Sequence, residues 1–141
     1  MLAYIVVQLQ MYSLLESDVD VKGHAYETIV GSNLRGDKGQ FFTPRNMCHM
    51  MVRMVDPSED DVILGPAMGT CGFLVTAMNY VLEKIGDSVN ASGRSKTAKQ
   101  EALIARKREF LSKHIVGIDF DPILVRASKM NMVMNNDGTG Q

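Results

Sequence analysis

The feature that most constrains the fold is a glycine-rich turn between a short apolar stretch and a helix. Residues 61–64 predict a strand, the run Gly-Pro-Ala-Met-Gly-Thr-Cys-Gly follows at 65–72, and residues 73–85 predict a helix. The residues expected to face inward on that helix are Phe73, Ala77, Tyr80 and Val81. Glycines let backbone amides approach a ligand, and a helix N-terminus presents unpaired N–H groups. The same pattern also suits a tight turn that binds nothing, so the turn alone leaves both interpretations open.

A second apolar stretch, residues 114–119, predicts a strand that is covered on both faces. Asp119 stands at its carboxyl end, where an acid in a doubly wound fold can accept hydrogen bonds from both ribose hydroxyls of a nucleoside. Asp119 could instead cap the next helix, but Asp121, directly before Pro122, suits that role better. Asp119 is therefore a candidate ligand-binding residue. The helix that follows is expected to run to about residue 135 and to bury Ile123, Ala127, Met130 and Met134.

The other predicted elements are mostly helical. Helices are expected at about 2–16, 24–33 and 98–112, with a polar loop at 86–97. Another helix is expected to begin with Thr43 as its cap and Pro44 as its first helical residue. Its inward face is expected to consist of Met47, Met50, Met51, Met54 and Val55. The order is helices, then strand–helix–helix–strand–helix, which predicts the beginning of a doubly wound α/β fold.

Composition limits the classes of function. The chain has 141 residues, enough for one domain with a core, and its net charge of -1 provides no bulk attraction for nucleic acid. Cys48 and Cys71 lack CxxC spacing, so we expect neither a zinc site nor a disulfide framework, and a cytoplasmic location. The apolar opening at residues 1–15 is too short to span a bilayer and lacks a basic start, so no membrane association is expected.

Three separated motifs together resemble a known family. They are Gln-Phe-Phe-Thr-Pro-Arg at 40–45, the glycine turn with Phe-Leu at 65–74, and Gly-Ile-Asp-Phe-Asp-Pro at 117–122. They are similar to successive motifs of the modification subunit of type I restriction–modification systems, which are adenine N6 DNA methyltransferases that use S-adenosylmethionine. The resemblance implies a partial, Rossmann-like methyltransferase fold preceded by N-terminal helices. The implied division is a helical segment at 1–38 and a truncated cofactor-binding domain at 39–141.

The resemblance also implies the residues of a cofactor site. The residues that would form a lip over the cofactor are Gln40, Phe41, Phe42, Thr43, Pro44 and Arg45. Periodicity alone favours a core role for the aromatic pair, and the resemblance moves it toward the pocket. The glycine turn would contact the methionine part through Gly69, Thr70, Cys71 and Gly72. Asp119 would hold the ribose, Phe120 would lie beside the adenine ring, and no metal would take part.

The chain departs from the family pattern within the turn. Gly65 stands where the family has aspartate, Met68 where it has cysteine, and Cys71 where it has glycine. A side chain at Cys71 is expected either to intrude where the backbone must pass close or to demand an unfavourable φ. The loss of the acid at Gly65 is expected to weaken cofactor binding.

The catalytic tetrapeptide of the family, Asn-Pro-Pro-Phe or Asn-Pro-Pro-Tyr, has no counterpart here. The four prolines are Pro44, Pro57, Pro66 and Pro122, so no Pro-Pro occurs. We therefore expect no catalytic residue in this chain and no methylation of DNA by it alone. An alternative is a degenerate cofactor-binding or assembly module that has lost catalysis. A nicotinamide-dependent oxidoreductase is less compatible, because a dinucleotide site has G-x-G-x-x-G with its acid about 20 residues on.

The resemblance also implies partners. DNA would bind to the complete enzyme, together with the specificity and restriction subunits of a type I system. Two strands leave open edges and exposed faces, so poor solubility is expected unless further copies of the chain cover them.

Overall fold

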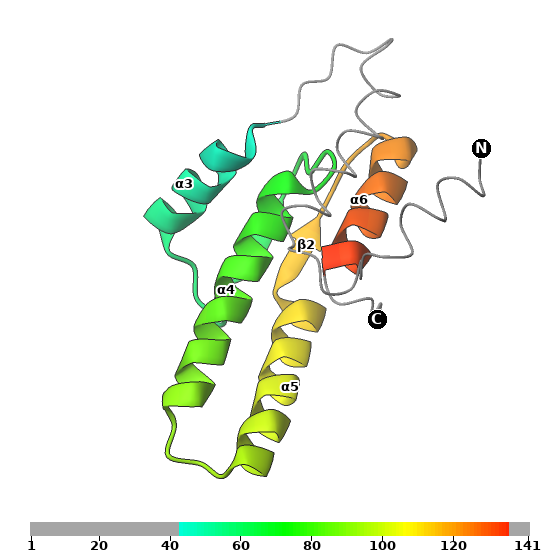
Figure 1. Ribbon diagram of the computed structural model, residues 1–141. Coiled ribbons are helices and arrows are strands. Elements are labelled where there is room, and N and C mark those ends of the chain that lie inside the picture. Colours follow the sequence, from blue (N-terminus) through cyan, green and yellow to red (C-terminus); the bar gives the residue numbers. More distant parts are fainter. Residues whose placement is uncertain (1–42, 136–141) are drawn as a thin grey trace, which may run out of the picture.

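The computed structural model describes residues 43–135 (Figure 1). The elements in chain order are α3 (Arg45–Val55), β1 (Ile63–Gly65), α4 (Gly72–Ala91), α5 (Lys96–Lys113), β2 (Ile115–Gly117) and α6 (Pro122–Asn135). This order confirms the predicted strand–helix–helix–strand–helix succession. The helices expected at 2–16 and 24–33 lie outside the described residues. Among residues 43–135, no helix combines the length and the apolar character needed to cross a membrane.

The two strands form a parallel pair. Ile63 lies opposite Ile115, and Gly65 lies opposite Gly117. Side chains alternate between the faces of a strand, so Ile63 and Ile115 point to one face, where both pack into the core against α4. The expected cover on both faces is not present in the described part of the chain. The exposed apolar residues of the opposite face are Val62, Leu64, Val116 and Ile118.

α4 and α5 lie side by side as a long helical hairpin (Figure 1). The loop expected at 86–97 is much shorter, because α4 continues to Ala91 and α5 starts at Lys96. The polar composition misled the prediction: Val89 is buried against the core, and this contact holds the last turns of α4 in helical form. Ser95 caps α5 by accepting a hydrogen bond from the Ala98 amide.

The inward faces of α3 and α6 differ from those predicted. The buried residues of α3 are Cys48 and Val52, while the methionines expected inside are exposed. α3 also begins at Arg45, with Pro44 in the cap position and no side-chain cap from Thr43. α6 buries Leu124, Ser128, Asn131 and Asn135 in place of the predicted stripe. Each buried position of α6 is one residue later than the predicted one. Three of the four buried side chains are polar, so a prediction from hydrophobic residues could not identify them.

On α4, the predicted inward residues divide into three kinds. Ala77 and Val81 are buried, Tyr80 is half-buried, and Phe73 is 39% exposed. Phe73 lies at the first turn of the helix, beyond the edge of the helix-packing core.

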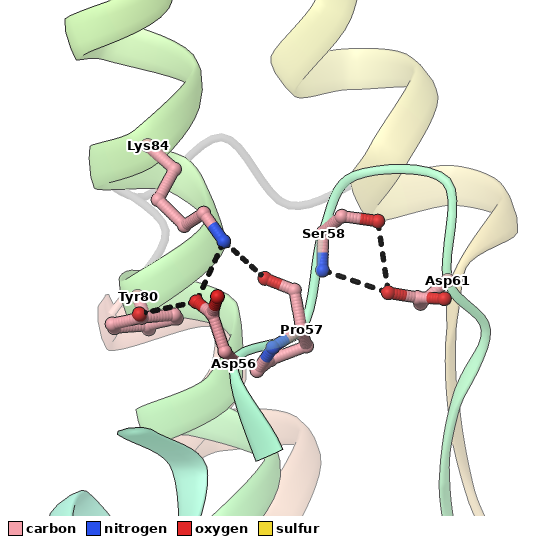
Figure 2. Close-up of polar contacts among 6 residues, drawn as sticks. All are labelled: Asp56, Pro57, Ser58, Asp61, Tyr80 and Lys84. Atoms are coloured by element: carbon pink, nitrogen blue, oxygen red, sulfur yellow. Dashed lines mark hydrogen bonds and ion pairs between the residues drawn. The ribbon is translucent and has the colours of Figure 1, made fainter. Parts of the chain in front are cut away.

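A polar cluster fixes the segment that joins α3 to β1 (Figure 2). Asp56 takes a left-handed conformation at the end of α3, and its carboxylate accepts hydrogen bonds from Tyr80 (2.6 Å) and Lys84 (2.8 Å) of α4. Lys84 also donates to the Pro57 carbonyl oxygen. A few residues on, Glu59 pairs with Arg106 of α5. The segment is therefore attached to both helices of the hairpin, which sets where β1 begins.

Candidate functional site

The glycine turn connects β1 to α4 through two left-handed residues. Gly69 has φ 56° and Cys71 has φ 69°. Glycine adopts this conformation without cost, whereas for cysteine it brings Cβ close to the backbone. The expected unfavourable φ at Cys71 is thus confirmed. Cys71 is also 3% exposed, so its side chain points into the protein and not toward a ligand.

Asp119 lies beside this turn although it is 50 residues away in sequence. Its Oδ2 accepts a hydrogen bond from the Gly69 amide at 2.9 Å, and its Oδ1 accepts one from the Asp121 amide at 3.0 Å. Asp121 accepts a hydrogen bond from the Ile123 amide at 2.8 Å, as a helix cap does. This confirms the predicted role of Asp121 as the cap of α6. A carboxylate has about four acceptor positions, so Asp119 can accept further hydrogen bonds from hydroxyl groups.

The turn backbone is held from a second side by α6. Asn131 is fully buried, and its Nδ2 donates to the Thr70 carbonyl oxygen at 2.7 Å. Sequence reasoning missed Asn131. The available signal was an asparagine at each of two positions four residues apart, Asn131 and Asn135, in the methionine-rich second half of the helix.

The turn also contains a sulfur contact and a buried thiol. The Cys71 Sγ lies 3.6 Å from the Met68 Sδ. Burial raises the pKa of the Cys71 thiol above its usual value, with a smaller contribution from the negative charge of Asp119 and an opposing one from a hydrogen bond with Ser128. The thiol is therefore protonated at neutral pH and is a poor nucleophile or metal ligand. Within residues 43–135, no group of three or more acidic, histidine or cysteine side chains could hold a metal ion.

Beneath the turn, the two strands approach α4 closely at their glycines. A Cβ on Gly65 would lie 3.0 Å from the Leu74 Cδ1, and a Cβ on Gly117 would meet the Met68 and Leu74 side chains. Leu74 is 4% exposed and has core neighbours on several sides. A side chain at either glycine would therefore crowd the first turn of α4 or the Met68 side chain.

An apolar cleft of about 680 Å³ runs along the free side of β1 to the turn. Its lining includes Met51, Val55, Val62, Leu64, Phe73 and Ala77, from α3, β1 and α4. The exposed methionine face of α3 thus borders the cleft in part through Met51. Asp119 and Phe120 do not line it.

The predicted site residues fall into four sets. The structure brings together Gly69, Thr70, Cys71 and Asp119, and Gly72 follows them as the first residue of α4. Phe120 follows Asp119 and is 94% exposed, as a ring available for stacking would be. Thr43 and Pro44 are exposed at the start of α3, and Arg45 is half-buried. The polar contacts described for the turn do not include Thr43 or Pro44. Gln40, Phe41 and Phe42 lie outside the described residues.

These features define a class of protein: an α/β unit whose parallel strands are joined by a helical crossover, with a glycine turn and an acid at adjacent strand ends. The family model for N-6 DNA methylases matches residues 17–140, so the chain belongs to that family. The resemblance to type I modification subunits is thereby confirmed.

Individual relatives agree with this assignment. The chain is 27% identical to the type I restriction enzyme StySPI methylase subunit of Salmonella potsdam, over 81% of this chain and 20% of that protein. It is 28% identical to the type II restriction enzyme and methyltransferase RM.BcgI of Heyndrickxia coagulans, over 86% of this chain and 17% of that protein. The crystal structure of the type I restriction enzyme EcoKI M protein matches with a TM-score of 0.54 and 25% identity, over 74% of this chain and 20% of that one. The chain thus spans about a fifth of the length of these relatives.

Proposed function

We propose that these residues form the S-adenosylmethionine-binding part of an adenine-N6 DNA methyltransferase of the type I restriction–modification kind. The observation that carries the proposal is the contact between Asp119 and the Gly69 amide, which puts the acid of one strand end beside the glycine turn of the other. Membership of the N-6 DNA methylase family supports the same conclusion. The doubly wound, Rossmann-like arrangement is part of this proposal, since the described residues contain two of its parallel strands.

The residues around the turn suit a nucleoside-containing cofactor. Asp119 offers acceptor positions to a pair of ribose hydroxyls, and the exposed ring of Phe120 offers a stacking surface for the adenine. The side chains of Thr70 and Cys71 are buried, so a ligand would contact this part of the turn through backbone atoms. S-adenosylmethionine, when bound, would supply an activated methyl group. The lip formed by residues 40–45 is proposed on the resemblance alone.

Transfer of the methyl group would need residues that this sequence does not contain. The target adenine must be flipped out and held by its amino group, and no Asn-Pro-Pro-Phe or Asn-Pro-Pro-Tyr occurs in the 141 residues. We therefore assign cofactor binding, and not catalysis, to these residues. DNA and the specificity and restriction subunits would be partners of the complete enzyme.

A second candidate function is a non-catalytic cofactor-binding or assembly module. Cys71 and Gly65 both depart from the turn that the family resemblance implies. The left-handed φ at Cys71 and the close packing at Gly65 therefore favour this second candidate. Both features also predict that the cofactor binds weakly.

Calorimetric titration of the 141-residue chain with S-adenosylmethionine and, separately, with NAD tests the proposal. We expect weak binding of S-adenosylmethionine and none of NAD. Asp119→Asn keeps an oxygen for the Gly69 amide, but it replaces the oxygen that accepts from the Asp121 amide by a donor and so removes acceptor capacity. It should lower the affinity about tenfold. Asp87→Asn, which removes the same charge from an exposed site on α4, should leave it unchanged. Binding of NAD without S-adenosylmethionine would overturn the proposal, and a folded chain that binds neither would favour the assembly module.

A further inference from the structure

α6 carries two buried asparagines on one face. Asn131 is 0% exposed and Asn135 is 6% exposed. Asparagine is a poor helix former, and a buried amide is costly unless it is hydrogen-bonded. A hydrophobic pair at these positions would stabilise the helix and the core more simply. The polar pair therefore needs a reason other than packing.

The hydrogen bonds of the pair lead to the glycine turn. The Asn131 Nδ2 donates to the Thr70 carbonyl oxygen at 2.7 Å, across 61 residues of sequence. The Asn135 Nδ2 donates to the Asn131 Oδ1 at 2.9 Å and to the Asn131 carbonyl oxygen at 2.8 Å. Because only the amide nitrogen can donate to a carbonyl, these contacts fix the orientation of the Asn131 amide. Asn135 orients Asn131, and Asn131 holds the turn.

The atom that Asn131 holds belongs to a critical peptide unit. The peptide between Thr70 and Cys71 is planar, and its two polar atoms are both engaged: the carbonyl with Asn131 and the Cys71 amide with the Met68 carbonyl oxygen at 2.8 Å. This peptide lies between two left-handed residues, Gly69 and Cys71. Cys71 joins this peptide to the next one, which carries the Gly72 amide, the first of α4. The orientation of the Thr70–Cys71 peptide therefore influences where the amides at the start of α4 point.

We propose that Asn131 is a positioning residue for ligand binding at the glycine turn, with Asn135 supporting it. This inference rests on the proposed cofactor site and adds a residue from a different helix to it. Asp119 holds the turn at Gly69 from the β2 side, and Asn131 holds it at Thr70 from the α6 side. Without the Asn131 hydrogen bond, the peptide keeps only the contact of its Cys71 amide with the Met68 carbonyl oxygen. Its orientation is then less firmly fixed, and the ligand has to restore it on binding.

The test compares Asn131→Asp, which keeps size and loses the donor, with Leu124→Ala, which also perturbs a buried side chain of α6. Binding of S-adenosylhomocysteine to the 141-residue chain is measured by calorimetry, well below the melting temperature of each variant. We expect Asn131→Asp to lower the affinity about tenfold, and Leu124→Ala to leave it within about twofold. The ¹⁵N amide signals of residues 70–72 in the ligand-free protein should shift in the first variant only.

Asn135→Ala provides a second measurement if Asn131→Asp does not fold. It removes the support for Asn131 but keeps the contact with Thr70, so the affinity should fall about threefold. Wild-type affinity in both asparagine variants, or unmoved signals at 70–72, would overturn the inference while the proposed function stands. A wild-type chain that does not bind S-adenosylhomocysteine would overturn both.

Discussion

Gly65 and Gly117 face each other across the two parallel strands, and the side chain of Leu74 lies against both. The absence of a Cβ on either strand lets α4 approach the sheet at the point where the glycine turn begins. The departure at Gly65 is thus linked to the packing of the first turn of α4.

The variant Gly65→Asp introduces the acid that the family resemblance implies at this position, and it should destabilise this chain. Its Cβ would lie 3.0–3.1 Å from two carbon atoms of the buried Leu74. Overpacking of this kind costs about 1–3 kcal/mol. Urea unfolding should show this loss, and the loss should be smaller in a Leu74→Ala background because the crowded atoms are gone. Equal losses in both backgrounds would contradict the assigned contact.

At residue 71 we expect a glycine variant to be more stable than an alanine variant, which reverses the usual order at a buried position. Cys71→Gly should be more stable than Cys71→Ala by about 1 kcal/mol, although glycine buries less, because residue 71 has φ 69°. Both variants remove the thiol and its contact with the Met68 sulfur, so their difference reports the backbone conformation against the burial of one methyl group. Thermal melting of the two variants measures it, and an alanine variant as stable as the glycine variant would count against a left-handed residue 71.

The Asp56 cluster predicts a pH-dependent contribution to stability. Hydrogen bonds from Lys84 and then Tyr80, together with the positive charge of Lys84, hold the pKa of Asp56 below its usual value. A carboxyl group whose pKa is lower in the folded state than in the unfolded state stabilises the fold at pH values above its unfolded-state pKa. That contribution to stability is lost as the pH falls through the folded-state pKa. Asp56→Asn should therefore lower the melting temperature at pH 7, and the difference from the wild type should shrink as the pH falls below 3.8, the usual pKa of the group. A constant difference for Asp56→Asn at all pH values would exclude the ion pair as its cause.

The open face of the sheet should cause self-association. Leu64 and Val116 are 54% and 41% exposed on adjacent strands. The double variant Leu64→Thr/Val116→Thr keeps a branched side chain at residue 116 but reduces the exposed apolar area of the sheet. It should therefore associate less, which sedimentation experiments would detect as a lower weight-average mass. Ile104→Thr changes an exposed apolar residue on α5 and should have less effect. An equal effect of the two changes would mean that the sheet face is not the site of association.

The sequence was sufficient to predict the order of the described elements and the role of Asp121 as a cap, because turns, caps and apolar runs are local signals. The extent of α4 could not be predicted, since the contact of Val89 with the core outweighs the polar composition of residues 86–97. The buried face of α6 was missed for a related reason. The buried Asn131 donates a hydrogen bond to Thr70, which is 61 residues away in sequence. Hydrophobic periodicity carries no information about such a distant partner. The contact of Asp119 with Gly69 likewise depends on strand pairing.

The most direct test of the central claim is a titration of the ¹⁵N-labelled 141-residue chain with S-adenosylmethionine, followed through its amide signals. If the glycine turn and Asp119 form the cofactor site, the signals of residues 69–72 and 119–121 should move together and saturate. The signals at the far end of the hairpin, residues 91–96, should stay in place. Saturable shifts confined to the hairpin, or no shifts at millimolar cofactor, would contradict the claim.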